Sequence, residues 1–150
     1  MKKSVKYTLL MVFVCVWCVC AGCGSVKVKY PAGRDTRESY GDGTFQLLSL
    51  RKTGPLYLSN EAYNSIVLCD VQGVRESDGM LYAIGSAGQC KVYFSADLST
   101  CRMYLCAVPQ DGEEFYINRL DEMEKNGDAV CYSSLAEFPE AAREAFEEIK

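Results

Sequence analysis

Residues 80–108 read MLYAIGSAGQCKVYFSADLSTCRMYLCAV, and this stretch contains three apolar runs separated by two short turn-like segments. Alternating apolar and polar side chains within a run are typical of β-strands, and the small and polar residues between the runs are typical of tight turns. Connections this short join antiparallel neighbours. The stretch therefore predicts a three-stranded meander, with strands at Met80–Ile84, Gln89–Ser95 and Cys101–Val108 and turns at Ser86–Gly88 and Asp97–Thr100.

The turns also predict how these strands pair. A three-residue loop at Ser86–Gly88, with Gly88 in the left-handed conformation, sets the first register, and pairing of Ala96 with Cys101 sets the second. Both registers place apolar side chains together on one face, whereas a slip of one residue in the second would place Phe94 against Arg102. The predicted opposite pairs are Met80 and Phe94, Tyr82 and Val92, Ile84 and Cys90, then Phe94 and Met103, Val92 and Leu105, and Cys90 and Ala107.

The second face of the predicted meander carries the candidate binding residues. In these registers Leu81, Tyr93 and Tyr104 lie side by side across the three strands, about 5 Å apart, with two cations beside them. Two alternatives stay open. Either a C-terminal helix covers this face and its glutamates meet the cations, or the helix covers the Val92 and Phe94 face, and the face with the tyrosines stays exposed and binds a partner. The candidate binding residues are Leu81, Lys91, Tyr93, Arg102 and Tyr104.

The flanking sequence predicts further strands and a helix at the C-terminus. Apolar residues recur at helical spacing over Leu135–Ile149, with glutamates mostly on the other side, and Ser134 and Glu137 have the spacing of a capping box. The predicted fold class is α+β, an antiparallel β-meander sheet with a C-terminal amphipathic helix. The other predicted elements are strands at Phe45–Leu50, Leu56–Leu58, Ile66–Val71 and Gly73–Glu76, and a short helical piece at Ile117–Lys125.

The N-terminus carries a targeting pattern. Three lysines within the first six residues precede an apolar run over residues 9–19, which ends in Val19-Cys20-Ala21-Gly22-Cys23. This arrangement resembles the signal peptide of bacterial lipoproteins. The resemblance implies that the chain is cut before Cys23 and that this cysteine is acylated, although Cys20 stands where leucine is usual in the pattern.

Two other interpretations of the N-terminus are secretion without a lipid and a retained membrane span. Residues 7–22 are too few for the roughly 20 that cross the hydrocarbon core, so the lipoprotein interpretation is favoured. The next residues are rich in glycine and in charges of both signs, as in a flexible linker. Tyr40–Phe45 resembles the opening of small uncharacterised secreted bacterial proteins, which implies no function. The predicted organisation is a signal peptide at 1–22, a membrane tether at 23–43 and a single domain at 44–150.

Composition excludes several classes of function. Residues 111–150 hold twelve acidic and four basic side chains, and no basic cluster occurs elsewhere, so we expect no nucleic-acid partner. The chain has no histidine, which excludes Ser-His and Cys-His nucleophile pairs and imidazole zinc ligands. Phosphate-loop and dinucleotide-binding motifs are also missing. We therefore expect no catalytic activity, no cofactor and no metal site.

Apart from these excluded classes of site, the nine cysteines are the main reactive groups of the sequence. Four of them belong to the predicted signal and anchor. Cys101 and Cys106 lie on one predicted strand, about 16 Å apart at roughly 3.3 Å per residue, too far for a disulfide. Cys90 and Cys106 lie on opposite faces in the predicted registers. We expect mostly unpaired thiols, with one disulfide or a metal or redox role as alternatives. The cysteines of the domain are Cys69, Cys90, Cys101, Cys106 and Cys131.

These features predict a lipid-anchored binding or interaction module outside the cytoplasm. Its membrane contact is the N-terminal lipid on Cys23, in the cell membrane or the outer membrane, and its partner is an unidentified protein or small molecule. Two alternatives are a thiol-based redox or metal-binding lipoprotein and a carboxylate-dependent hydrolase. The hydrolase requires two acidic side chains that converge in one pocket, which spacing in the sequence cannot reveal.

Overall fold

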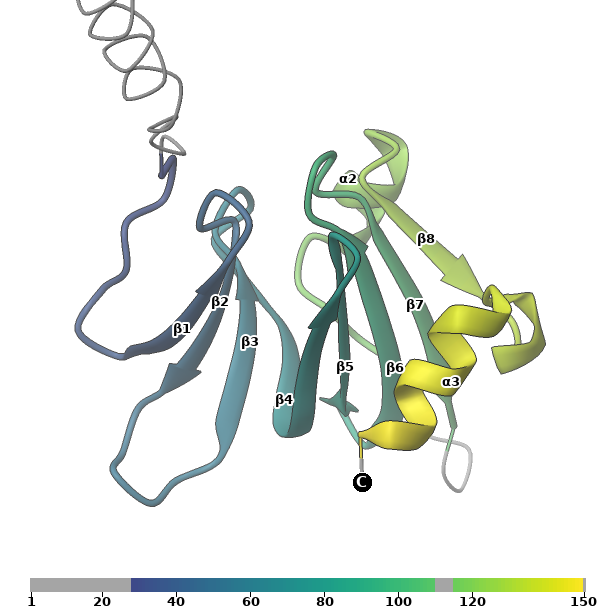
Figure 1. Ribbon diagram of the computed structural model, residues 1–150, viewed down its shortest axis with the longest axis horizontal. Coiled ribbons are helices and arrows are strands. Elements are labelled where there is room, and N and C mark those ends of the chain that lie inside the picture. The colour runs from purple at the N-terminus through teal and green to yellow at the C-terminus, as the bar shows by residue number, and fades with distance from the viewer. Residues whose placement is uncertain (1–27, 110–114, 150) are drawn as a thin grey trace, which may run out of the picture.

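The computed structural model describes residues 28–109 and 115–149, so the predicted signal peptide and Cys23 lie outside the described residues. Within them the strands form one eight-stranded sheet whose spatial order follows the chain (Figure 1). The strands are β1 (Thr36–Tyr40), β2 (Phe45–Ser49), β3 (Leu56–Asn60), β4 (Ser65–Ser77), β5 (Met80–Ala87), β6 (Cys90–Asp97), β7 (Met103–Val108) and β8 (Ala129–Tyr132). The helical elements are α2 (Leu120–Lys125), the 3-10 turn η1 (Leu135–Glu137) and α3 (Glu140–Glu148).

The sheet is mixed and the fold is mostly β, with two short helices in the described residues, one of them at the C-terminus. Neighbouring strands from β1 to β7 are antiparallel, as the predicted meander requires. The prediction of a wholly antiparallel sheet is wrong at β8, which runs parallel to β7. A parallel neighbour needs a crossover connection, and the segment that contains α2 provides it.

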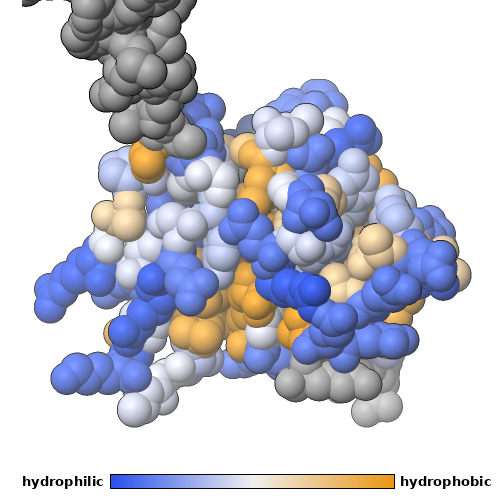
Figure 2. All heavy atoms as spheres, in the orientation of Figure 1, coloured by the Kyte–Doolittle hydropathy of each residue, from blue (hydrophilic) through white to orange (hydrophobic). Residues whose placement is uncertain are grey.

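Strand β4 joins the two halves of the sheet. The sequence predicts two separate strands here, but the structure has one long strand whose register shifts between Cys69 and Gly73. Figure 1 shows β1–β3 on one side of β4 and β5–β8 on the other. The inner side chains of both halves form one core, in which the Phe45 and Phe94 rings meet edge to face with centroids 5.7 Å apart. Figure 2 shows hydrophobic atoms along the line between the two halves.

The predicted register of β5 and β6 is wrong by three residues. The turn has two central residues, Gly88 and Gln89, and Ala87 pairs with Cys90. Gly88 has φ 62°, at the position of a two-residue hairpin turn where glycine is preferred. Because three is an odd number, the shift exchanges the faces of β5. The β5 residues that enter the inner core are therefore Leu81, Ala83 and Ala87, while Tyr82 and Ile84 lie on the outer face.

The register of β6 and β7 differs from the predicted one by two residues, which keeps every side chain on its predicted face. Phe94 pairs with Leu105, and Ala96 pairs with Met103 rather than with Cys101. The Asp97 carboxylate accepts hydrogen bonds from the backbone N–H groups of Ser99 and Thr100 (2.8 and 3.2 Å), and Cys101 adopts φ 59°. These features build a turn two residues longer than the predicted one.

The folded domain begins earlier than the predicted boundary at residue 44. β1 lies within the predicted tether, yet it pairs with β2, and Tyr40 is only 7% exposed. The backbone N–H groups of Lys29 and Tyr30 donate to the carbonyl of Asp42. The tether prediction is therefore wrong from β1 onward, because β1 carries mostly polar, exposed side chains and has little of the apolar alternation that marks a strand.

The C-terminal helix packs on the outer face of β5–β7, as Figure 1 shows, and its outward side carries hydrophilic residues (Figure 2). The predicted helix at Leu135–Ile149 is divided: the capping box of Ser134 and Glu137 caps the start of η1, and α3 begins after Pro139. The end of the helix lies close to β4, since a Cβ atom on Gly73 would come within 2.6 Å of Ile149 Cγ2. No helix in the described ranges is long and apolar enough to cross a membrane.

Candidate functional site

The outer face of the sheet is aromatic where α3 covers it. Phe146 of α3 meets the rings of Tyr82 and Tyr93 edge to face, with centroid distances of 5.9 and 5.4 Å. Phe138 contacts both Phe146 and Tyr132 in the same geometry. These contacts form a second hydrophobic core, separate from the one between the two halves of the sheet. This second core holds α3 against the outer face of the sheet.

Four of the five candidate binding residues lie on this outer face, and one does not. Leu81 is 0% exposed in the inner core, because the shifted β5 register turns it away from the tyrosines. Tyr93 and Tyr104 are half-buried, and Tyr104 stacks on Tyr132 with centroids 5.9 Å apart. Lys91 Nζ lies 5.0 Å from the centre of the Tyr93 ring, and Arg102 lies 5.7 Å from that of Tyr104.

Of the two alternatives for this face, the structure has the one in which the C-terminal helix covers it. The expected pairing of helix glutamates with Lys91 and Arg102 is wrong, however. Glu148 forms its ion pair with Arg75 of β4 instead. Neither Lys91 nor Arg102 belongs to an ion pair within residues 28–109 and 115–149. No ion pair with a described residue neutralises either charge, so both side chains can contact an anionic ligand.

A groove of about 360 Å³ runs along one flank of α3. Its volume is within the usual range for small-molecule sites. The lining combines an apolar and aromatic surface with two cations, one from β6 and one from α3. The residues that line this groove, called the Lys91 groove below, are Gln72, Ile84, Lys91, Tyr93, Leu135, Arg143, Phe146, Glu147 and Ile149.

A second groove, of about 320 Å³, lies along the helix where Tyr104 and Tyr132 stack. It is lined almost wholly by apolar and aromatic side chains, and no charged residue lines it. The tyrosines there pack on one another, so they are part of the helix-docking core as much as of the groove wall. Lacking a charged group to orient a ligand, this groove is the weaker candidate. Its lining includes Met80, Tyr82, Tyr104, Tyr132, Pro139 and Ala142.

Sequence reasoning found Lys91 and Tyr93 of the Lys91 groove but missed Ile84, Arg143 and Phe146. Ile84 was assigned to the opposite face through the β5 register. Phe146 and Arg143 are three residues apart on the predicted helix, so they share one of its sides. That spacing was the available signal for a cation beside the helix-docking aromatic residue.

Among the residues that the structure describes, no cysteine lines either groove. Cys69, Cys101, Cys106 and Cys131 are not joined by disulfides. Burial raises the pKa of the Cys106 thiol, and burial together with a hydrogen bond to Glu124 raises that of Cys131 to about 12. Thiols with raised pKa values are weak nucleophiles at neutral pH. In the part of the chain that the structure describes, no three acidic or cysteine side chains gather as metal ligands.

No family model, curated protein or solved structure matches this chain. The assignment of a function therefore rests on the geometry and charge of the sites themselves.

Proposed function

We propose that this protein is a lipid-anchored binding module that acts outside the cytoplasm and takes up small amphipathic anions in the Lys91 groove. Cys23 is the proposed site of acylation, and the anchor lies in the cell membrane or the outer membrane. The lysine-rich start, the apolar run and the small residues before Cys23 support the anchor. The proposed module has no catalytic activity and no cofactor.

A single observation carries the choice of ligand. Lys91 and Arg143 both line the groove, and neither belongs to an ion pair among the described residues. An aromatic surface formed by Tyr93 and Phe146 lies beside them. Ligand sites of this type use apolar walls to bury the body of the ligand and a few charged groups to orient it. One anionic group on an apolar or aromatic body is the ligand chemistry that matches both features.

The groove differs in charge from the protein as a whole, and this difference favours an anionic ligand. The sequence holds 20 acidic against 16 basic residues, so the molecule as a whole repels anions. Lys91 and Arg143 outnumber Glu147, the one acidic residue of the lining. The groove is therefore locally cationic, and complementary charge orients and selects a ligand.

Loss of the two groove cations is expected to weaken anion binding. For Lys91→Gln combined with Arg143→Gln, we expect the fluorescent fatty acid dansylundecanoate to bind about tenfold more weakly, since two partly exposed charge contacts contribute about 1–2 kcal/mol together. Titration followed by dansyl fluorescence measures the change. Dodecanoate should displace the probe, whereas the cation dodecyltrimethylammonium should not.

A matched control separates the groove from net charge. Arg37→Gln combined with Lys125→Gln makes the same change of charge at two exposed positions outside the groove, and it should alter the affinity less than twofold. Equal weakening in both double variants, or equal displacement by the cationic and anionic competitors, would refute the groove as the site.

The anchor is tested independently of the ligand. We expect Cys23→Ser to abolish incorporation of labelled fatty acid and to leave the protein uncut or released, because stable attachment requires the acyl chains that Cys23 would carry. Metabolic labelling and membrane fractionation measure both effects. Cys15→Ser makes the same exchange within the apolar run, outside the pattern Val19–Cys23; it is the control, and it should still take up label. A Cys23→Ser protein that is labelled and sediments with membranes contradicts the proposed anchor.

A further inference from the structure

A cluster of positively charged side chains lies at the β1 edge of the sheet. The cations come from two segments that the fold brings together, the start of β1 with the residues before it and the loop between β2 and β3 (Figure 1). Both segments line a hollow of about 340 Å³. Strand β2 separates them in the sequence, which is why no basic run marks the cluster there. Its cations, called the basic edge below, are Arg34, Arg37, Arg51 and Lys52.

Backbone hydrogen bonds hold both segments of the basic edge in place. The backbone N–H of Ser49 donates to the carbonyl of Asp35 at 2.9 Å, which ties the residues before β1 to the end of β2. In the loop, the carbonyl of Arg51 accepts from the Ser49 hydroxyl at 2.5 Å and from the backbone N–H of Gly54 at 3.3 Å. The cations therefore project from an ordered main chain, so less conformational entropy is lost when they meet a partner.

The basic edge keeps an excess of positive charge. None of its four cations belongs to an ion pair within the part of the chain that the structure describes. Asp35 is the one acidic residue that lines the hollow. Glu38, farther along β1, accepts a hydrogen bond from the hydroxyl of Tyr40 at 2.5 Å instead. Four cations against one carboxylate make this surface a site for an anionic partner.

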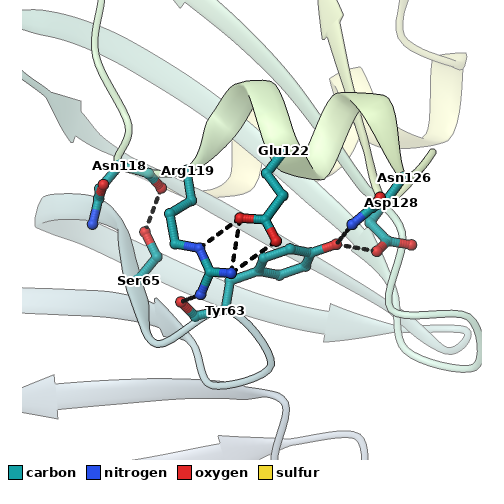
Figure 3. A network of polar contacts seen from close by, with 7 residues as sticks. All are labelled: Tyr63, Ser65, Asn118, Arg119, Glu122, Asn126 and Asp128. Carbon is teal, nitrogen blue, oxygen red and sulfur yellow. Dashed lines mark hydrogen bonds and ion pairs between the residues drawn. The ribbon is translucent and has the colours of Figure 1, made fainter.

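Two other arginines show what a cation with a role in the fold looks like. Figure 3 shows Arg119 before α2, where its guanidinium pairs with Glu122 at 2.8 Å and its Nη1 donates to the Tyr63 carbonyl at 2.7 Å. Arg75 of β4 pairs with Glu148 of α3. Each of these contacts joins two elements of the structure. The side chains of the basic edge form no such pair among the described residues, so their charges are available to a partner outside the chain.

Charge is distributed unevenly between the two ends of the sheet. Residues 28–60, which contain β1–β3, hold five basic and three acidic side chains. Residues 115–149, which contain β8 and both helices, hold three basic and nine acidic ones. Strands β1 and β8 are the opposite edges of the sheet. A negatively charged surface therefore attracts the β1 edge and repels the other end, which orients the whole domain.

An exposed leucine lies beside these cations and narrows the class of partner. Leu50 is 64% exposed, lines the same hollow and directly precedes Arg51 and Lys52 in the loop. Large apolar side chains next to Lys and Arg are typical of protein segments that lie at the surface of a bilayer. The apolar group enters between the lipid headgroups, and the cations contact the anionic ones. A soluble anion or a nucleic acid has no apolar layer for the leucine.

The proposed anchor brings a lipid surface close to this edge. Cys23 is five residues before Val28, and five residues span at most about 18 Å. Figure 1 shows the described chain entering the domain on its β1 side. We propose that the basic edge contacts an anionic lipid bilayer and turns the half of the sheet with α3 and the Lys91 groove away from it. The short distance to the membrane rests on the proposed acylation of Cys23, whereas the affinity of the basic edge for anionic lipid does not.

Hydrogen exchange of the mature protein on two kinds of vesicle tests this contact. Vesicles of phosphatidylcholine are compared with vesicles in which about a third of the lipid is phosphatidylglycerol; on the second we expect peptides over residues 31–37 and 50–54 to exchange about threefold more slowly. Peptides over α3 should not change. In about 0.5 M salt the difference should disappear, because the charges are screened. Equal exchange on both vesicles, or slowing only in α3, would overturn the proposal.

The same vesicles separate a failure of the anchor from a failure of the surface contact. Flotation with phosphatidylcholine vesicles measures the anchor alone, since these vesicles carry no net charge. A protein that does not float with them lacks the anchor. Its exchange with and without phosphatidylglycerol still supports or refutes the contact of the basic edge, because that contact depends on the charge of the lipid.

Two variants and a matched control locate the contact. Arg34→Gln combined with Arg37→Gln should remove most of the protection of residues 50–54, and Leu50→Ala, at an exposed position, should reduce it about twofold. Arg102→Gln combined with Lys125→Gln makes the same change of charge at two exposed positions outside the basic edge and should keep the protection. Equal loss of protection in both double variants would show an effect of net charge and would contradict the proposed surface.

Soluble anions distinguish the bilayer from other partners of the same charge. Inorganic phosphate and a short DNA duplex, each at the phosphate concentration of the lipid, should protect residues 50–54 less than the anionic vesicles do. Neither offers an apolar layer to Leu50, so neither should respond to Leu50→Ala. Equal protection by phosphate would assign the hollow to a small anion, and equal protection by DNA would assign the surface to nucleic acid. Either result would overturn the proposal.

Discussion

Replacing Phe94 with alanine is expected to lower the free energy of unfolding by about 3–5 kcal/mol, the usual loss when a buried phenylalanine is truncated. Phe94 is 0% exposed and meets Phe45 across the core between the two halves of the sheet. Its loss removes apolar contacts from both halves and leaves a cavity between them. Because small domains have only 5–15 kcal/mol of stability in total, the variant should be near the limit of folding at room temperature. Urea denaturation followed by circular dichroism measures the change.

Leu50→Ala is the control for this prediction. Leu50 is 64% exposed, and truncating it should change the free energy of unfolding by less than about 0.5 kcal/mol. Phe45→Ala should resemble Phe94→Ala, and the double variant should cost less than the sum of the two, because the rings are in contact. A loss below about 1 kcal/mol in Phe94→Ala, or strict additivity with Phe45→Ala, would contradict a core shared by the two halves.

The face of each side chain in β6 and β7 could be predicted from the sequence, but the faces of β5 could not. The choice for β5 depended on the length of one hairpin turn. Gly88 was correctly expected in the left-handed conformation, yet this residue fits both a two-residue and a three-residue loop. The two loops differ by an odd number of residues in register, which exchanges Leu81 with Tyr82 and Ile84 between core and surface. A polarity pattern cannot detect this error when both faces of a strand are apolar.

The Lys91 groove was predictable only where its residues come from a single strand. Lys91 and Tyr93 were found because they lie two residues apart on one predicted strand. Arg143 reaches the same groove from a helix, and its place depends on how α3 crosses the sheet. The polar pocket of about 350 Å³ that Asp42 and Asp128 share was not predictable at all, since its residues come from both halves of the sheet.

Replacing Phe146 with alanine is expected to undock α3 while the sheet stays folded. Phe146 makes edge-to-face contacts with Tyr82, Tyr93 and Phe138, and it is 4% exposed. Truncation should remove about 3–5 kcal/mol of local stability. A helix of nine residues is too short to persist alone in water, so α3 should unfold once its contacts are lost. Trypsin should then cut after Arg143, and the amides of α3 should lose protection from hydrogen exchange before those of β2 and β3.

The same substitution links stability to the proposed ligand site, because Phe146 and Arg143 both belong to the Lys91 groove. Undocking of α3 would remove the side of that groove that the helix forms, so dansylundecanoate binding should be lost in Phe146→Ala. Glu144→Ala, at an exposed position of the same helix, is the control and should change neither property. If β2 and β3 lose protection together with α3, the helix belongs to the same cooperative unit as the sheet, and the expected local undocking is wrong.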